Sequence, residues 1–173
     1  MRQKSHTLRR RARHGAQLVE MALVMVPFLA ILLAFFDVCM VMFRWTTLQN
    51  AVREGSRYAV TFRRMGGLGQ DASIKQVVQN YSLGTVSATA TNPEQISVNY
   101  YAPAAPNTPI AAPNGNSPGN IVEVSVPAYR WNWIAPLSGT LSNPFYATSP
   151  LSITVRSADI LGGYPVGTNT VPR

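Results

Sequence analysis

The sequence predicts an α+β protein in which a long N-terminal membrane helix continues into an amphipathic stem and packs on a small antiparallel β-sheet domain with one short helix. Three observations lead to this fold class. Residues 21–43 form an apolar run of membrane length, and residues 44–64 repeat apolar side chains at helical spacing. Three later segments alternate apolar and polar residues, as half-buried strands do.

The positive charge of the chain is concentrated in its N-terminal tail. The formal net charge is +8, and six basic residues with no acid lie within the first 14 positions. The rest of the chain carries nine basic and seven acidic side chains. A basic tail that abuts an apolar run is explained by membrane topology, so we expect a membrane and no nucleic acid as its partner.

The apolar run predicts a retained transmembrane helix. Met21 to Phe43 contains 23 residues with one charge, Asp37, and one proline, Pro27. About 20 apolar residues span a bilayer core. The run is too long for the core of a cleaved secretory signal, and no small-x-small cleavage site follows it. Because basic flanks stay on the cytoplasmic side, we expect a cytoplasmic N-terminus and a single span.

Asp37 lies about two-thirds of the way along this span, where a carboxylate is unfavourable unless it is paired or protonated. Two interpretations are open. Asp37 can sit at the membrane interface and need no role, or it can contact a partner helix within the membrane.

The junction between the tail and the apolar run contains a second acid. Gly15 ends the basic leader, and Glu20 is the fifth residue after it. One interpretation is that Glu20 only favours a helix start, since a carboxylate there suits the helix dipole. The other is that the segment resembles a type IV prepilin processing signal, which would make Gly15 and Ala16 the scissile pair.

A longer segment, about residues 14–62, resembles the TadE/TadG-like family of tight-adherence (Flp) pilus systems. The resemblance lies in a Gly-small-x-x-Val-Glu-x-Ala-Leu start, a proline and an acid in the span, and an alanine-rich turn ending in Glu-Gly-x-Arg. The matching residues are Gly15, Ala16, Val19, Glu20, Ala22, Leu23, Pro27, Asp37, Ala51, Arg53, Glu54, Gly55 and Arg57. Met21 stands where Flp-type signals often have an aromatic residue, and Ser56 replaces the usual alanine.

This resemblance implies a non-catalytic minor pseudopilin with a pilin-like outer domain in a bacterial inner membrane. A prepilin peptidase would cut between Gly15 and Ala16. Glu20 would then set subunit register by pairing with the new N-terminus of a neighbouring subunit. The implied partners are that peptidase, sister pseudopilins, the Flp pilin, and an inner-membrane platform with its cytoplasmic ATPase.

The stem is predicted from a stripe of apolar residues at spacings of three and four. Its members are Trp45, Leu48, Val52, Gly55, Ala59 and Phe62. The stripe favours a core contact within the chain over an intermolecular coiled coil. Gly55 has no side chain on this seam, so we expect another helix or a strand to approach closely there.

The remaining chain predicts the small domain. Asp71 is expected to cap a short helix that stops at Gly84, and residues 95–101, 120–126 and 151–157 are expected to be strands. Residues 102–119 contain five prolines and predict an exposed loop. The expected organisation is a leader at 1–15, a membrane helix at 16–43, a stem at 44–65 and an outer domain at 66–173.

The aromatic residues Tyr129, Trp131 and Trp133 share one face of an extended segment and are out of phase with the preceding valines, so Pro127 is expected to mark a bulge. We expect this aromatic face to pack in the core, although Tyr and Trp also suit a contact with a partner subunit or with the membrane interface.

No side chains in the sequence are spaced as a catalytic or metal-binding set, since neither histidine lies beyond residue 14 and the acids are scattered. We expect no enzyme, no cofactor and no metal. The alternative to a pseudopilin is an uncleaved single-pass membrane protein that binds an envelope ligand through its Pro-rich loop and aromatic face.

Overall fold

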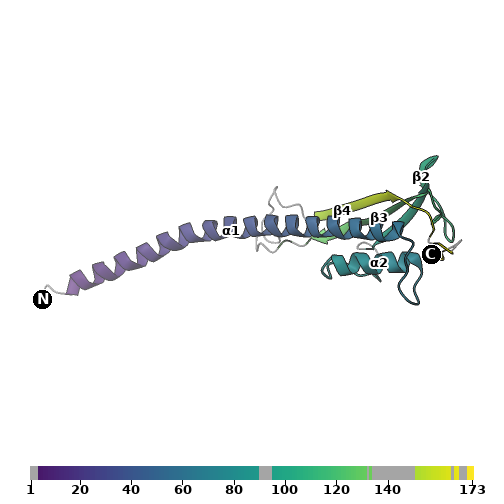
Figure 1. Ribbon diagram of the computed structural model, residues 1–173. Coiled ribbons are helices and arrows are strands. Elements are labelled where there is room, and N and C mark those ends of the chain that lie inside the picture. The colour runs from purple at the N-terminus through teal and green to yellow at the C-terminus, as the bar shows by residue number, and fades with distance from the viewer. Residues whose placement is uncertain (1–3, 90–94, 132, 134–150, 165, 168–170) are drawn as a thin grey trace. The chain divides into compact units, whose positions relative to one another are not determined.

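The computed structural model describes residues 4–89, 95–131, 133, 151–164, 166–167 and 171–173, with side chains from residue 16 onward. The chain divides into two compact units. The first comprises Met1–Met40 and Trp133–Ser149, and the second comprises Val41–Asn132 and Pro150–Arg173. The element order within the described residues is two helices followed by four strands, which agrees with the predicted α+β class (Figure 1).

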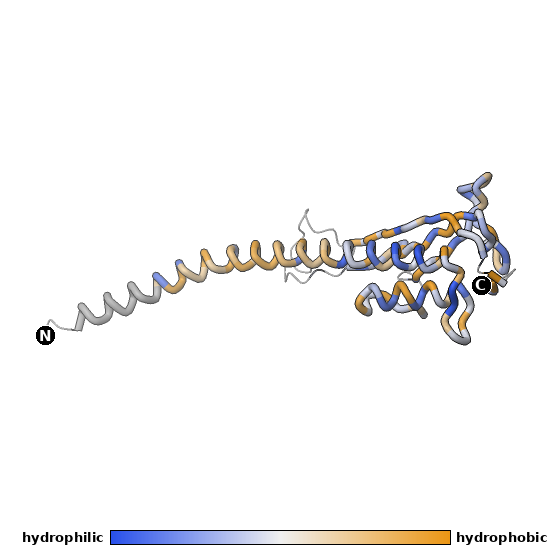
Figure 2. Tube along the Cα trace, in the orientation of Figure 1, coloured by the Kyte–Doolittle hydropathy of each residue, from blue (hydrophilic) through white to orange (hydrophobic). Residues whose placement is uncertain are grey.

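Helix α1 runs from Lys4 to Val60 and includes Pro27. Its segment Ala16–Val60 is long and apolar enough to cross a membrane, and among the described residues it is the one helix that is so. Figure 2 shows the apolar residues as a long continuous stretch of this helix. Most of its large apolar side chains between Leu18 and Phe36 are exposed, as expected for side chains whose solvent is lipid.

The helix ends at Val60, five residues before the predicted end of the stem at residue 65. The glycines at 66–69 are therefore not its stop signal. Instead, the Phe62 N–H donates to the Ala59 carbonyl at 3.1 Å, and Phe62 takes a positive φ of 51°. A left-handed residue just past the last turn is a common helix terminator, although the position usually holds glycine. Phe62 is buried and its ring centroid lies 4.8 Å from that of Tyr164.

Helix α2 spans Gln70–Tyr81. The prediction that Asp71 caps it is wrong, because the N-cap is Gly69 and makes no side-chain cap bond. Ser73 organises this end instead. Its hydroxyl donates to the Gly69 carbonyl at 2.8 Å and accepts from the Met65 N–H at 2.9 Å. Asp71 is thereby left free to bind side chains from other elements.

The strands form one antiparallel sheet in the order β2-β1-β3-β4. They are β1 (Ser97–Ala102), β2 (Ala105–Pro109), β3 (Ile121–Trp131) and β4 (Leu151–Ile160). The register of β3 against β4 shifts between Val126 and Tyr129, so the irregularity predicted at Pro127 is present.

Strand β2 is an addition to the prediction, since it lies inside the expected Pro-rich loop 102–119. All five of its residues are exposed, so it has no apolar face and no alternating pattern to reveal it. It pairs only with β1, at the edge of the sheet. An edge strand tolerates Pro106 and Pro109 because one of its sides needs no ladder hydrogen bonds.

The core of the second unit lies where α1, α2 and the sheet meet. Buried residues from all three contribute to one cluster, including Leu48, Val52, Ile74, Val78, Tyr100, Val122, Val124 and Val155. Gly55 marks the closest approach. A Cβ atom built on Gly55 would lie 2.5 Å from Val78 Cγ2 on α2 and 3.4 Å from Val124 Cγ1 on β3. Both a helix and a strand therefore pack against the bare backbone of α1.

Candidate functional site

The predicted processing segment lies within the continuous helix α1. Gly15 and Ala16 are both helical, and the side chains of Ala16 and Glu20 are exposed. Ala16 and Glu20 are four positions apart, so they share one helix face and are separated by about 6 Å along the axis. A glycine inside a helix costs roughly 1 kcal/mol relative to alanine, so Gly15 is a weak point of this helix.

Asp37 is buried, with 1% of its surface exposed, whereas most of the surrounding apolar side chains of α1 are exposed. Both interpretations of Asp37, a position at the membrane interface and a contact with a partner helix, therefore stay predictions.

The predicted stem residues separate into two groups. Leu48, Val52, Gly55, Ala59 and Phe62 are buried. Trp45 differs from the expectation, since it is 46% exposed and contributes nothing to the core cluster of described residues. The buried face begins one turn later than the stripe indicated.

Two stem residues that the stripe omitted are also buried. Ala51 is fully buried, and Ser56 is buried with its hydroxyl 3.0 Å from that of Ser157 on β4. Gln49 donates to the Arg156 carbonyl at 3.3 Å, which adds a second polar contact between α1 and β4. The small side chains at 51 and 56 are the signal that could have revealed this wider face, because small residues let a sheet approach a helix.

A buried polar network joins the end of α1 to the C-terminal residues. Gln70 is fully buried, donates to the Ala59 carbonyl at 3.0 Å and accepts from Asn116 Nδ2 at 2.8 Å. Asn116 Nδ2 also donates to the Val171 carbonyl. The sequence offered no sign of this network, since it connects residues from four distant segments.

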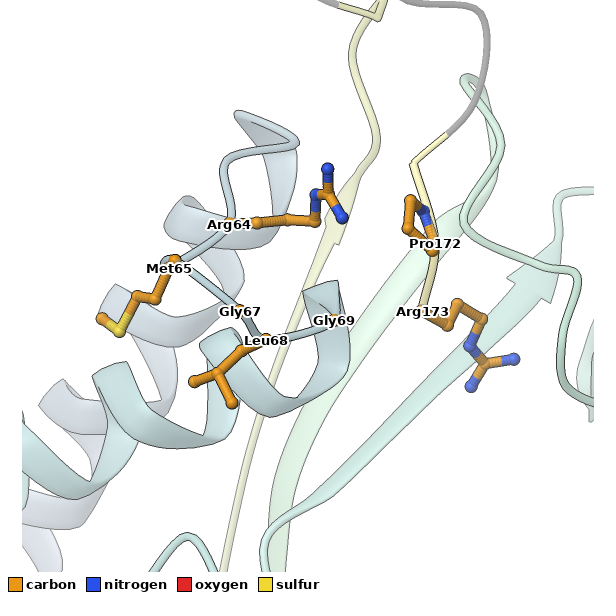
Figure 3. Close-up of a pocket in the computed structure, with 8 residues that line it drawn as sticks. Arg64, Met65, Gly67, Leu68, Gly69, Pro172 and Arg173 are labelled. Atoms are coloured by element: carbon orange, nitrogen blue, oxygen red, sulfur yellow. The ribbon is translucent and has the colours of Figure 1, made fainter.

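The glycine-rich turn after α1 borders an open pocket of about 470 Å³ (Figure 3). Its lining comes from residues 64–69 together with Pro172 and Arg173. Gly69 leaves room for the last residue, because a Cβ there would lie 2.2 Å from the Arg173 carbonyl oxygen. Within the part of the chain that the structure describes, no three His, Cys, Asp or Glu side chains gather as a metal site would require.

Arg173 and Asp71 bind each other beside Tyr100. Arg173 NH2 lies 3.0 Å from Asp71 Oδ2, and the guanidinium carbon lies 4.5 Å from the centroid of the Tyr100 ring. The Tyr100 hydroxyl donates to Asp71 Oδ1 at 2.7 Å. Burial raises the pKa of Tyr100 well above its usual range, and the Asp71 carboxylate raises it further. Tyr100 therefore stays protonated in the folded protein.

This arrangement predicts an alkaline loss of stability. Below the unfolded-state pKa of about 10, Tyr100 is protonated in both states. Above it, only the unfolded chain loses the proton, so the free energy of unfolding falls by about 1.4 kcal/mol per pH unit for this one group. Tyr100→Phe should remove that component. Unfolding of the full chain in detergent between about pH 9 and pH 11 measures it, and Tyr101→Phe is the control on the same strand. An unchanged slope for Tyr100→Phe would contradict the assignment.

The aromatic face is divided between the two units. Trp131 is buried at the end of β3, and Tyr129 is half-buried against the core, as the core interpretation expected. Trp133 is half-buried and belongs to the first unit.

Comparison with protein families gives a match over part of the chain. Residues 15–57 match the family model described as TadE-like protein. No curated protein and no solved structure shows significant similarity to the chain. The match begins at Gly15 and ends at Arg57, so it covers the membrane-length part of α1 and most of the stem.

The TadE-like segment lies almost entirely within Ala16–Val60, the one helix of membrane length among the described residues. Over residues 15–57 the chain is TadE-like, and the resemblance predicted from its sequence is confirmed.

Proposed function

We propose that this chain is a minor pseudopilin of a tight-adherence (Flp, type IVb) pilus or secretion system, processed by a prepilin peptidase after Gly15. It would lie in a bacterial inner membrane with its N-terminus in the cytoplasm and its second unit outside. The observation that carries the proposal is the family match, which starts at Gly15 and includes Glu20 and most of the stem.

The local chemistry at Gly15 supports processing. A protease needs its substrate backbone extended, and the helical segment around Gly15 must unwind to reach an active site. Glycine lowers that cost because it stabilises a helix less than any other residue except proline. Removal of the leader would expose an α-ammonium at Ala16, one turn from the exposed Glu20 carboxylate.

The proposed partners follow from the same role. The peptidase would act on the leader, and sister pseudopilins and the Flp pilin would pack against the apolar face of α1. The inner-membrane platform and its cytoplasmic ATPase would add or remove subunits. No cofactor or catalytic residue is needed, because the chain would act by assembly.

The competing function is an uncleaved, membrane-anchored binding protein. The fully exposed strand β2 favours it, since an exposed edge offers backbone groups to a ligand. The two functions differ in one property that can be measured directly, which is whether the leader remains on the mature chain.

Processing predicts a mature chain that starts at Ala16. Gly15→Leu should block it, because a bulky side chain at the scissile position obstructs the peptidase. Intact-mass measurement of the protein from membranes of a host with the peptidase gives the result. Ala12→Leu is the matched control, with the same side chain added three residues upstream. A wild-type chain that starts at Met1 in the membrane would overturn the pseudopilin proposal in favour of the anchored binding protein.

A further inference from the structure

The turn that follows α2 exposes large apolar side chains. Leu83 is 71% exposed and Tyr81 is 52% exposed, although the residue between them, Ser82, is fully buried. Exposed leucines are common singly, but here two large side chains are exposed within three residues of one turn. The turn lies in the second unit and is fully described.

The backbone of this turn is held firmly. The Ser82 N–H donates to the Val78 carbonyl at 2.9 Å, and the Ala88 N–H donates to Gln79 Oε1 at 2.7 Å. Leu83 has a positive φ of 54°. A leucine is strained in this region, where glycine would be comfortable. The turn therefore holds a bulky apolar side chain outward at a backbone position that does not favour one.

The position of the turn along α1 is fixed by contacts within the second unit. At one end of α2, Gln70 bonds the Ala59 carbonyl at 3.0 Å. Past its other end, Arg44 NH1 donates to Thr85 Oγ1 at 2.5 Å. Helix α2 is thus antiparallel to α1, as Figure 1 shows, and the turn at 81–85 reaches the level of Arg44.

Arg44 marks the point at which the apolar run ends. The run extends to Phe43, which is 50% exposed, and Met42 before it is 58% exposed. Trp45, the stem residue that does not join the core, is 46% exposed at the same level. The end of the second unit that adjoins the span in sequence therefore carries exposed aromatic and aliphatic side chains beside an arginine.

We propose that Tyr81, Leu83 and Trp45 form a lipid contact through which the second unit rests on the surface of the bilayer that α1 crosses. The inference depends on the single-span anchor of the proposed function. Tyrosine and tryptophan favour the interface between headgroups and acyl chains. Lipid is preferred to a protein partner because Thr85 of this turn bonds Arg44, the residue that directly follows the apolar run, and the last side chains of that run, Met42 and Phe43, are exposed in the same unit.

The test places an environment-sensitive fluorophore, NBD, on single cysteines of the full chain in nanodiscs of phosphatidylethanolamine and phosphatidylglycerol. The native Cys39 reports insertion of the span. Leu83→Cys and Leu68→Cys, each combined with Cys39→Ser, compare the two ends of α2. Leu68 is the matched control because it is also an exposed leucine, at 40%, but lies before the start of α2.

A blue-shifted emission at position 83 that shallow doxyl-labelled lipids quench, with neither effect at position 68, is the expected result. Equal accessibility of both positions to aqueous iodide would overturn the inference. A blue shift at 83 without doxyl quenching would also overturn it, since a protein would then cover the patch. If either of these results is obtained while the label at Cys39 is quenched, the membrane span is supported and only the lipid contact is overturned. An unquenched Cys39 would overturn the anchor and the contact together.

A second variant separates the side chain from the fold. Leu83→Gly removes the proposed lipid contact and suits the positive φ, so its melting temperature should not fall. With the fluorophore moved to Tyr81→Cys, Leu83→Gly should reduce doxyl quenching relative to the same label with Leu83 intact. Unchanged quenching with an unchanged melting temperature would contradict a lipid role for Leu83.

Discussion

Replacing Gly55 by leucine should destabilise the second unit by about 3 kcal/mol or more, the upper end of the usual cost of overpacking a core. The first added carbon alone would lie 2.5 Å from Val78 Cγ2, and Val124 on the sheet leaves little room on the other side. Neither neighbour can withdraw freely, because both are fully buried. We expect thermal unfolding of the full chain in detergent, followed by near-ultraviolet circular dichroism, to shift down by roughly 10 °C or more.

In the smaller change Gly55→Ala, two effects of similar size on stability oppose each other. Alanine gains about 1 kcal/mol of helix propensity over glycine. Overpacking against Val78 costs about 1–3 kcal/mol. The net change is therefore expected to be destabilising by up to about 2 kcal/mol. Adding Val78→Ala to this variant removes the methyl groups that clash, so the double variant should be more stable than the two separate losses predict.

Gly66→Leu is the matched control for Gly55→Leu. A Cβ at Gly66 would meet nothing within 4 Å, and its backbone has no positive φ. Its stability should stay within about 0.5 kcal/mol of the wild type. If Gly55→Leu melts as the control does, the close approach of α2 and β3 to α1 at this residue is wrong.

The features that the sequence predicts well are those written in local periodicity. An apolar run of membrane length, a stem stripe, and three strands with alternating faces all depend on neighbours within one element. The valines at 122, 124 and 126 show this, since all three are fully buried as their alternation requires. The close approach of another element at Gly55 could be predicted for the same reason, because it required only the position of this glycine within the stem stripe.

The features that were missed depend on contacts between distant segments or on weak local signals. Asp71 looked like a helix cap, but its partners Tyr100 and Arg173 lie far along the chain. Phe62 has the positive φ of a helix terminator, which its residue type does not announce. Strand β2 has no buried face, so no periodicity could mark it. The sequence pattern did not reveal these three features, because each depends on burial or on pairing with residues far away in the chain.

The N-terminal motif differs from both groups, since its proposed role depends on other molecules. In the proposed assembly, the Glu20 carboxylate pairs with the α-ammonium of Ala16 on a neighbouring subunit within the membrane. Both groups are costly in a low dielectric when alone, and pairing removes most of that cost. Because the chain alone leaves Glu20 exposed, its contribution should appear in assembly and not in folding.

Glu20→Gln is therefore expected to leave processing and folding intact while blocking incorporation. Removing one partner of a buried ion pair costs about 3–5 kcal/mol, which corresponds to a loss of roughly 100-fold or more in association. The measurement is the amount of processed chain that copurifies with the pilus machinery from solubilised membranes. Mass spectrometry of the same sample verifies that each variant still starts at Ala16.

Glu54→Gln provides the matched control on the same helix. Glu54 carries the same charge and pairs with Arg57 at 3.3 Å, one turn away on the stem. That pair is solvent-exposed, so its loss should cost less than about 1 kcal/mol and leave incorporation near the wild-type level. If Glu20→Gln incorporates as Glu54→Gln does, the acid does not set subunit register, and the dipole of the helix start suffices to explain it. If only Glu20→Gln is excluded, the charge at this position acts between subunits, because its removal leaves the mature chain and its folded unit unchanged.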